Sequence, residues 1–564
     1  MNKKTVFALL LLILMGAGLR LYGILWDQGF NLHPDERAII LFSLPLHFPS
    51  TLQSFLSPAS PLNPHFFAYG SFPLYLLKAT ATIISLVIHI PIGYGNIAII
   101  GRMLSTLADI GTLILVFLLG RKIASDKVGL LAACCYAFAT FSIQVSHFYA
   151  VDTLLTFFIT STLYALLYFY ENPTIKKALL IGFLLGISLA TKDSALALLA
   201  AIGSALIADL TLLISHENRK QKIKKMLINF IVFGLLICFT SIITFFIFEP
   251  YALLDFSSFW FQTMQQAQMT HSAFTFPYTL QYVGKVPYVY ELENIFLWGL
   301  GPAITTFSGI GLALFLYTIY RKSKKQKWAH ETILLIFFLS YFIVVGKFAI
   351  GFMRYMLPVY PLLALFAGIG ISSLLHIFNK IKNIWLTIGI ALYIGILITY
   401  WPLSFIHIYS KPNTRVQATT WILNNIPPGS TIAVEHWDDQ LPLLNAQAYN
   451  ILTLPLYDPD TKEKWQAITA ELAKTDYIII ASNRLYVPLQ KLANCKKYPF
   501  PYCYPLTSEY YHKLFSGQLG FSMVAEFSIY PTIPFTNIRI NDQAADESFT
   551  VYDHPKVMIF KRTP

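Results

Sequence analysis

Long apolar stretches, separated by short polar segments, make up the first three quarters of this chain. A transmembrane helix needs about 20 consecutive, mostly apolar residues to cross the hydrocarbon core of a membrane. Eleven stretches approach this length, near residues 5–26, 101–120, 128–147, 152–170, 178–192, 195–214, 227–248, 296–320, 332–350, 355–376 and 384–407. The pattern therefore predicts a polytopic α-helical membrane protein with about eleven spans.

The pattern changes at about residue 410, beyond which short strand-like runs alternate with helical periodicity. We expect helices at 414–425 and 462–474 and strands at 431–435, 477–480 and 557–560. The chain is therefore divided into a transmembrane domain, 1–409, and a C-terminal α/β domain, 410–564.

Composition and charge agree with this division. Of the 564 residues 55% are hydrophobic and only 12% are charged, against about 25% charged in soluble proteins, which excludes an ordinary soluble enzyme. The formal net charge of +12 belongs to the membrane part, because residues 411–564 carry 14 basic and 14 acidic residues. Basic runs placed between spans do not favour nucleic-acid binding.

Six short basic clusters predict the topology, because cytoplasmic loops are enriched in Lys and Arg. They are Lys3/Lys4, Arg121/Lys122/Lys127, Lys176/Lys177, Arg219 to Lys225, Arg321 to Lys327 and Lys380/Lys382. All six face the cytoplasm only if the apolar stretch 71–92 is interfacial or re-entrant, and Pro73 and Pro91 interrupt it. We expect a multi-pass plasma-membrane protein with the N-terminus inside, an uncleaved first span, and the tail outside. The first loop, 27–100, and a later loop, 249–295, are then extracytoplasmic.

Eight basic residues of the membrane part lie outside these clusters, all at or near the outer face: Arg20, Arg37, Lys78, Arg102, Lys192, Lys285, Lys347 and Arg354. The acids Asp35, Glu36, Asp152 and Asp193 lie at the same face. Ionisable residues bordering a span are costly and mark candidate sites. Both signs on one face are typical of a site that binds an anion and uses a carboxylate chemically.

The most informative motif, His33-Pro34-Asp35-Glu36-Arg37, directly follows the first span. Adjacent acids there suit deprotonation of an acceptor hydroxyl, together with metal binding or ordering of the loop. The alternative is a helix start, with proline in the first turn and acids favoured by the helix dipole. Asp152 is likewise either a second site acid or the N-cap of the next span.

Three cations are candidates for holding a phosphate: Lys192, Arg354 and Arg102. Arg354 stands at the outer end of a span, where snorkelling to lipid head groups is the alternative. Arg102 begins a span, where a cation opposes the helix dipole, and this favours a functional contact. The first loop adds three candidates for lining the site: His65, Tyr69 and Lys78.

Two cysteines of the tail, Cys495 and Cys503, either close a small disulfide loop outside the cell or remain unpaired thiols. Spacing alone leaves both alternatives open.

Together these residues resemble the membrane glycosyltransferases of the GT-C fold, specifically glycosyltransferase family 39 and its bacterial relatives of the protein mannosyltransferase and aminoarabinose transferase type. The resemblance covers the membrane part and rests on Asp35-Glu36, Asn63-Pro64-His65-Phe66-Phe67, Tyr69, Pro73-Leu74-Tyr75, Arg102, Asp152, Ala190-Thr191-Lys192, Arg354-Tyr355 and Pro358. It implies a polyprenyl-phosphate-linked sugar donor, inverting transfer, an extracytoplasmic active site and juxtamembrane helices in the first loop.

The resemblance also implies roles for single residues. Asp35 is the catalytic base, and Glu36 supports the first loop or the site. Asp152 is the second-loop acid, which binds a divalent metal in some relatives and not in others, so a metal cofactor stays open. Lys192, Arg354 and Arg102 hold the donor phosphate. The acceptor, whether protein, lipid or glycan, also stays open, since we recognise no MIR-type β-trefoil domain.

A transporter or flippase of lipid-linked sugars is the alternative function. Transporters usually carry polar groups at mid-membrane and often show two related halves. The predicted spans are apolar in their centres and show no half-repeat, so an enzyme is favoured. A membrane scaffold with a partner-binding tail would leave the Asp35-Glu36 pair without a role.

The topology predicts that a cysteine at position 95 (Gly95→Cys), in a chain whose free thiols are replaced, reacts with a membrane-impermeant maleimide on intact cells. Lys177→Cys, in a predicted cytoplasmic cluster, is the matched control and should react only after permeabilisation. The reverse pattern would overturn the placement of 71–92.

Overall fold

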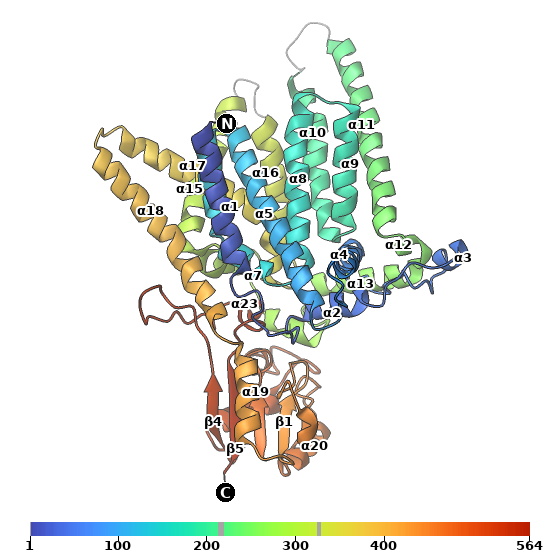
Figure 1. Ribbon diagram of the computed structural model, residues 1–564, viewed down its shortest axis with the longest axis vertical. Coiled ribbons are helices and arrows are strands. Elements are labelled where there is room, and N and C mark those ends of the chain that lie inside the picture. The colour runs from blue at the N-terminus through green and yellow to red at the C-terminus, as the bar shows by residue number, and fades with distance from the viewer. Residues whose placement is uncertain (1, 213–218, 324–328, 564) are drawn as a thin grey trace.

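The computed structural model describes residues 2–212, 219–323 and 329–563, and in it a helical bundle stands on a small sheet domain (Figure 1). Helices at all the predicted span positions build the bundle: α1 (Lys3–Leu21), α5 (Ile97–Ile123), α6 (Asp126–Ala137) with α7 (Thr140–Ser146), α8 (Val151–Glu171), α9 (Ile175–Leu189), α10 (Leu198–Leu212), α11 (Arg219–Phe248), α15 (Gly301–Ser323), α16 (Ala329–Gly346), α17 (Tyr360–Asn379) and α18 (Ile384–Phe405). The end of the predicted span 195–214 and residues 324–327 of one basic cluster lie outside the described residues. The predicted fold class, a polytopic helical membrane part with a C-terminal α/β domain, is confirmed.

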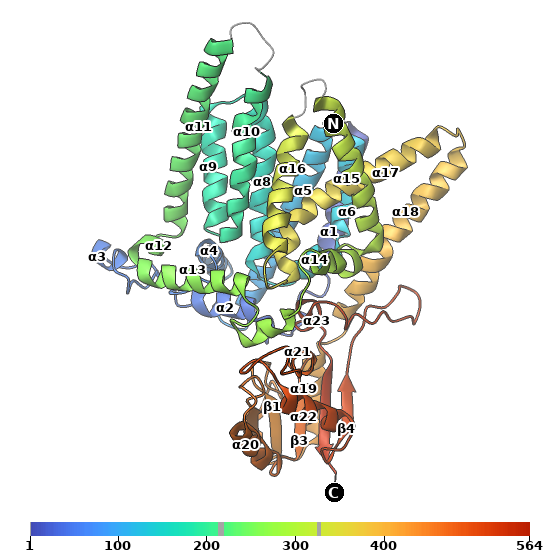
Figure 2. The same cartoon turned by 180° about the vertical axis from the view of Figure 1, so that it is seen from behind.

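The number of spans depends on three short helices. Within the described residues, seven helices are long and apolar enough to cross a membrane, or eight if α6 and α7, which meet at 59°, form one span. α9 and α10 have 15 residues each and α16 has 18, fewer than a typical span. The length criterion therefore gives fewer spans than the eleven predicted, although the three helices lie side by side with α8 and α11 (Figure 2).

The two ends of the bundle differ in what they carry. α1, α9 and α11 begin, and α5 and α8 end, at the end of the bundle far from the sheet domain (Figure 1). There Lys122 pairs with Glu171, with 2.6 Å between Nζ and Oε2. The helix ends that bear the predicted basic clusters therefore gather opposite the sheet domain.

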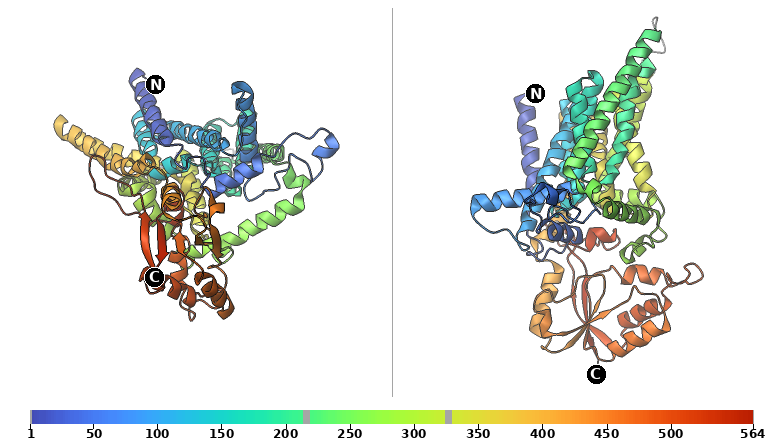
Figure 3. Two further views of the ribbon diagram at one scale, coloured as in Figure 1. Left: turned by 60° about the horizontal axis from the view of Figure 1, so that its bottom comes forward. Right: turned by 90° about the vertical axis from the view of Figure 1, so that its right-hand side faces the viewer.

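The stretch 71–92 does not run along the bundle. Its helix α4 (Phe72–Ile88) is seen end-on in Figure 1 and lies crosswise to the spans in the right-hand view of Figure 3. Five shorter helices lie with α4 at the end of the bundle that is nearer the sheet domain: α2 (Pro34–Ser43), α3 (Leu52–Phe55), α12 (Tyr251–Leu254), α13 (Phe256–His271) and α14 (Val289–Asn294). This direction agrees with an interfacial position for α4.

The expectation that the span centres are apolar is wrong for α5. Asp109 is fully buried in this helix, and its carboxylate accepts hydrogen bonds from Arg20 Nε of α1, at 2.5 Å, and from the Tyr136 hydroxyl, at 2.6 Å. Arg20 also donates to the carbonyls of Gly16, Ala137 and Tyr136. Both charges are therefore bound by protein groups. Arg20 and Asp109 join α1, α5 and α6, and they do not indicate a path for a transported substrate.

Small residues bring α15 and α17 close together. A Cβ atom on Gly311 would lie 1.7 Å from the carbonyl oxygen of Phe366, and one on Gly370 would lie 2.5 Å from that of Phe307. Such contacts let helix backbones pack tightly where lipid supplies no hydrophobic driving force.

The sheet domain holds a mixed five-stranded sheet in the order β2-β1-β3-β5-β4, with β1 parallel to β2 and β3 and with β5 antiparallel to β3 and β4. Its elements are α19 (Thr414–Asn425), β1 (Thr431–Glu435), β2 (Asn450–Leu454), α20 (Lys462–Leu472), β3 (Tyr477–Ile480), α21 (Tyr486–Lys491), α22 (Pro505–Phe515), β4 (Phe521–Phe527) and β5 (Val557–Arg562). The predicted strands β1, β3 and β5 are buried, whereas the edge strands β2 and β4, which the sequence pattern missed, are largely exposed. Cys495 and Cys503 form a disulfide.

Between β4 and β5 the chain leaves the sheet and packs against the bundle. This stretch contains α23 (Glu547–Thr550), where the ring of Phe549 lies 5.1 Å from that of Phe405 and 6.5 Å from that of Trp401. The sheet domain is thus joined to the bundle by a buried internal segment as well as by the α18–α19 connection.

The close approach of α15 and α17 predicts that Gly311→Ala lowers the Tm of the purified protein in detergent. The added methyl group must displace the Phe366 carbonyl, and overpacking of this kind costs about 1–3 kcal/mol. A Cβ atom on Gly309, in the same helix, would meet no neighbouring atom of the described residues within 4 Å, so Gly309→Ala should leave the Tm unchanged. Equal Tm values for the two variants would contradict this packing.

Candidate functional site

Four charged side chains, distant in sequence, meet at the end of the bundle that faces the sheet domain. Asp35 is ion-paired with Arg354. Asp152 Oδ1 lies 2.8 Å from Lys192 Nζ, and its Oδ2 lies 3.9 Å from Arg354 Nε. Carboxylates and cations therefore alternate in space, in the order Asp35, Arg354, Asp152 and Lys192. We call these four side chains the charged cluster.

Each member of the charged cluster lies at a helix end. Asp35 is in the first turn of α2, and Asp152 is in the first turn of α8, where the helix dipole favours a carboxylate. Lys192 directly follows the end of α9, and Arg354 lies in a 3-10 turn, Met353–Val359, that leads into α17. The structure agrees with the interpretation of the motif as a helix start, because α2 begins at Pro34 and Asp35 lies in its first turn. Asp152 is not an N-cap, because Ala150 holds that position and the Asp152 side chain turns to Lys192.

Burial and charge compete at Asp35. Burial alone raises the pKa of its carboxyl, but Arg354, a hydrogen bond from Tyr69 and Lys192 together lower the pKa below its ordinary value. His33 is the N-cap of α2 and accepts a hydrogen bond from the Glu36 amide at Nδ1. Burial lowers the pKa of His33 to about 3, so its ring stays neutral and can accept this bond.

Aromatic rings surround the two cations. Lys192 Nζ lies 4.4 Å from the ring centre of Tyr355 and 5.9 Å from that of Tyr69, and the Arg354 guanidinium lies 4.9 Å from the ring of Phe352. The Nε donor of Arg354 is buried and, among the described residues, makes no hydrogen bond. The site therefore contains a buried donor that faces Asp152 Oδ2 at 3.9 Å, beyond hydrogen-bond distance.

An apolar cavity of about 860 Å³ opens beside the charged cluster. Most of its wall comes from α11, α13, α16 and the turn Asp193–Ala197 that leads into α10, and Lys192, Tyr69 and Tyr355 line it as well. The cavity thus joins a long apolar volume to basic and phenolic groups of the site.

Glu249 also lines this cavity, and the sequence pattern did not indicate it. It directly follows α11, is 2% exposed, and receives a hydrogen bond from the backbone of Ser71. Burial raises the pKa of its carboxyl well above the ordinary value. The sequence signal that could have identified Glu249 is its position as an acid between the end of an apolar span and Pro250.

The predicted contact of Arg102 with the donor phosphate does not fit the structure, whereas the contacts of Glu36 agree with the expected support of the first loop. Arg102 is buried, and its five N–H groups all donate: to Glu36 at 2.9 and 2.7 Å, to Asp27 at 3.0 and 2.6 Å, and to the Ile24 carbonyl at 2.7 Å. Glu36 also accepts a hydrogen bond from the Tyr149 amide at 3.0 Å. No donor of Arg102 is left for a phosphate. Arg102, Glu36, Asp27 and the Ile24 carbonyl, which together we call the Arg102 knot, hold the first loop against α5.

Two of the three candidates for lining the site lie elsewhere. Lys78 Nζ donates to the Leu44 carbonyl at the end of α2, at 2.6 Å. His65 is largely exposed and lies 3.5 Å from Asp255. Only Tyr69 reaches the charged cluster, because it lies nearer the α9–α10 corner, where Gly70 packs against the backbone of Ala190.

The segment between α23 and β5 reaches the site from the sheet domain, which no sequence pattern indicated. The Tyr552 ring packs against His33 at a tilt of 54°, with 4.3 Å between centroids, and Phe148 stacks on His33 at 4.4 Å. Asp553 accepts hydrogen bonds from Tyr409 at 2.8 Å and from Gln144 at 3.0 Å.

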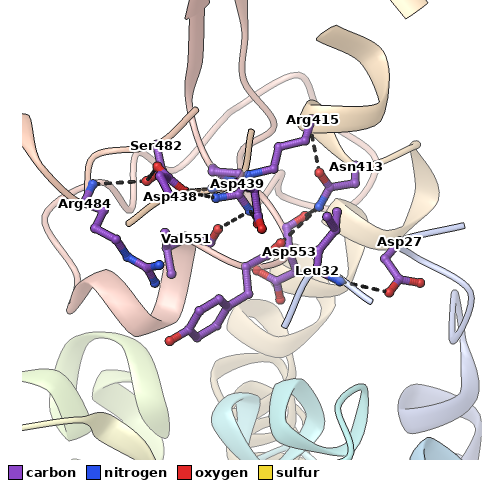
Figure 4. A network of polar contacts seen from close by, with 12 residues as sticks. Asp27, Leu32, Asn413, Arg415, Asp438, Asp439, Ser482, Arg484, Val551 and Asp553 are labelled. Atoms are coloured by element: carbon purple, nitrogen blue, oxygen red, sulfur yellow. Dashed lines mark hydrogen bonds and ion pairs between the residues drawn. The ribbon is translucent and has the colours of Figure 1, made fainter. Parts of the chain in front are cut away.

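Further polar contacts hold the same segment against the sheet domain (Figure 4). Asn413 donates to the Asp553 carbonyl at 3.0 Å, and Arg415 donates to the Val551 carbonyl at 2.7 Å and to Asp438 at 2.8 Å. On the bundle side, Arg37 of α2 pairs with Asp439 at 2.9 Å. The sheet domain therefore contacts the turn that carries Asp35.

The charged cluster does not fit a divalent metal. Its two carboxylates already face Lys192 and Arg354, and the described residues contain no group of three or more His, Cys, Asp or Glu side chains placed to bind one ion. We derive no step through a metal.

The family described as dolichyl-phosphate-mannose-protein mannosyltransferase matches residues 80–245. No curated protein matches the chain in sequence.

Among solved structures, the archaeal oligosaccharyltransferase AglB from Archaeoglobus fulgidus, in complex with an inhibitory peptide and a dolichol-phosphate, has a TM-score of 0.53 at 14% identity, covering 99% of this chain and 88% of that one. ArnT from Cupriavidus metallidurans bound to undecaprenyl phosphate has a TM-score of 0.43 at 12% identity, covering 86% and 94%. The S. cerevisiae protein O-mannosyltransferase Pmt1-Pmt2 complex bound to the sugar donor has a TM-score of 0.33 at 17% identity, covering 46% and 34%. The chain is a multi-pass membrane protein with the GT-C fold, as the resemblance predicted.

The contact between the Tyr552 and His33 rings predicts that the sheet domain stabilises the first turn of α2. In Tyr552→Ala, amide hydrogen exchange at the start of α2 should rise by roughly 2- to 10-fold, since an aromatic pair contributes about 0.5–1.5 kcal/mol. Tyr552→Phe keeps the ring and should exchange like the wild type. Unchanged exchange in Tyr552→Ala would show that the contact does not hold this turn.

Proposed function

We propose that this protein transfers a hexosyl or pentosyl group, with inversion, from a polyprenyl-phosphate-linked donor to a hydroxyl group of an extracytoplasmic acceptor. The observation that carries the proposal is the meeting of Asp35, Asp152, Lys192 and Arg354 beside the apolar cavity. Carboxylate for the acceptor, cations for the leaving group and an apolar volume for the lipid are the three parts that this reaction requires.

The donor would lie across the cavity and the charged cluster. Its prenyl chain fits the apolar wall of α11, α13 and α16, and its phosphate fits Lys192 and Arg354. The unpartnered Nε of Arg354 supports this position, because a buried donor without an acceptor is costly unless a ligand supplies one. The complex of AglB with dolichol-phosphate shows a lipid phosphate bound to a protein of this fold.

The chemistry then needs one base and two cations. Asp35 accepts the proton of the acceptor hydroxyl while the hydroxyl oxygen bonds to the anomeric carbon from the face opposite the phosphate. The bond between that carbon and the phosphate oxygen breaks, and its electron pair leaves with the lipid phosphate. Lys192 and Arg354 stabilise the charge that develops there.

Donor binding would also activate the base. Without a ligand, Arg354 is ion-paired with Asp35 and lowers the pKa of its carboxyl. A phosphate that takes Arg354 weakens this pair, so the pKa of Asp35 rises and the carboxylate becomes a stronger base. Asp152 keeps Lys192 and Arg354 in place for the phosphate.

The acceptor would approach between the bundle and the sheet domain, where the Tyr278 ring lies 6.4 Å from Phe352 and 6.2 Å from the exposed Trp437. In this proposal residues 1–409 catalyse the transfer and residues 410–564 contact the acceptor outside the plasma membrane, with the N-terminus in the cytoplasm. Protein, lipid and glycan acceptors all fit this arrangement.

The proposal predicts that Asp35→Asn lowers transfer by about 10²–10⁴-fold, the usual contribution of a general base. The assay compares cell-envelope glycans and glycoproteins of a deletion strain with those of the strain complemented by wild type or variant. Because the pKa of Asp35 in the donor-free protein lies below its ordinary value, the kcat/KM of wild-type transfer should not fall between pH 7 and pH 5 through protonation of Asp35. The loss should appear only as the pH falls through that lowered pKa.

Glu293→Gln, which removes an exposed acid of α14 in the later loop, is the matched control and should restore the glycan fully. Full restoration by Asp35→Asn would refute the catalytic assignment. A deletion strain that keeps transferase activity in detergent extracts but accumulates lipid-linked sugar on the cytoplasmic side would favour a flippase instead.

A further inference from the structure

A short hairpin projects from the sheet domain between β4 and α23. Its two sides are joined by backbone hydrogen bonds from the Ile540 amide to the Pro531 carbonyl, at 2.8 Å, and from the Ile533 amide to the Ile538 carbonyl, at 3.0 Å. The Thr536 amide closes the tip on the Ile533 carbonyl at 3.1 Å. Residues 531–540, which we call the 531–540 hairpin, are therefore an ordered element.

The tip of the hairpin presents large apolar side chains to its surroundings. Phe535 is fully exposed, at 108% of its reference area, and Ile538 is 59% exposed. Phe535 has a φ of 62°, a conformation that a bulky residue rarely adopts. Backbone strain of this kind persists where a side chain must be held in a particular direction.

The position of the hairpin relative to the last span is set by a hydrogen bond. The Thr532 amide donates to the Ser404 carbonyl near the end of α18, at 3.0 Å. Figures 1 and 2 show this loop beside the end of α18 that is nearer the sheet domain, at about the height of α2 and α13. α13 lies crosswise there and exposes Trp260 and Phe261, as a helix at a membrane surface does.

Basic residues flank the apolar tip. Arg539 is exposed, and it and Lys411 lie close enough to His407 to interact with it electrostatically. An apolar tip with cations behind it matches the order of acyl chains and phosphate groups at an anionic lipid surface.

We propose that the 531–540 hairpin inserts into the membrane leaflet on the side of the sheet domain. Phe535 and Ile538 enter the boundary between head groups and acyl chains, and Arg539 with Lys411 binds the phosphates of anionic phospholipids. The hairpin thereby anchors the sheet domain at a second point beyond α18. This inference does not depend on the reaction proposed above.

The anchor has a structural consequence for the site. The chain continues from the hairpin through α23 to Tyr552, whose ring contacts that of His33. A hairpin fixed in the leaflet would limit the movement of that segment relative to α2.

The test is photo-crosslinking of the full chain in nanodiscs that contain an alkyne-bearing phospholipid. A benzophenone amino acid at Phe535 should form several-fold more lipid adduct than the same group at Met523, which is 53% exposed on β4 in the sheet. Leu392, 65% exposed on α18, is the positive control. Arg539→Gln should lower the adduct at position 535 in discs rich in phosphatidylglycerol and not in discs of phosphatidylcholine.

Two outcomes would overturn the proposal. A lipid adduct at 535 no greater than at 523 means that the tip lies in water. Adducts at 535 formed only with a second copy of this chain mean that a protein surface covers the tip. Neither outcome bears on the Asp35→Asn result, because the nanodisc assay measures no transfer.

Discussion

The Arg102 knot is the interaction on which the arrangement of the site depends. It joins two carboxylates of the first loop region, Asp27 and Glu36, to α5 inside a buried environment. Removing one partner of a buried ion pair costs about 3–5 kcal/mol, because the remaining charge is left uncompensated. Glu36 is adjacent to Asp35, so the knot sets where the first turn of α2 presents Asp35 to Arg354.

The charged cluster shows how such charges are kept at a membrane boundary. Two carboxylates and two cations alternate, which balances the charge and satisfies most of the polar atoms. The same balance leaves the Nε of Arg354 without an acceptor among the described residues and places Lys192 against the apolar cavity. The ion pairs therefore keep the buried charges compensated, while one N–H donor of Arg354 remains without a hydrogen bond at the position where an anion would bind.

The sheet domain contributes to the site by a route that its sequence does not indicate. Its segment between β4 and β5 passes under the bundle, where Asp553 joins α7 and the end of α18 through Gln144 and Tyr409. His554 is fully buried, and although burial lowers its pKa, Asp542 and Asp553 together raise it to about 10. The histidine is thus held charged between two carboxylates, and the segment that carries Tyr552 is fixed on both sides.

The sequence by itself determined the helical membrane fold, the α/β tail, a non-spanning stretch at 71–92 and the position of Asp35, Asp152, Lys192 and Arg354 at one end of the bundle. These follow from local properties: apolar length, periodicity, the position of basic clusters and the cost of a charge at a span end. The sequence could not separate Arg102 from Arg354, because both are single arginines at span ends. Only the tertiary structure decided this, since Asp27, Glu36 and the Ile24 carbonyl occupy every donor of Arg102, whereas Arg354 keeps a free one among the described residues. Tyr552 and Glu249 likewise acquire their places through contacts with residues far away in the chain, which no local pattern encodes.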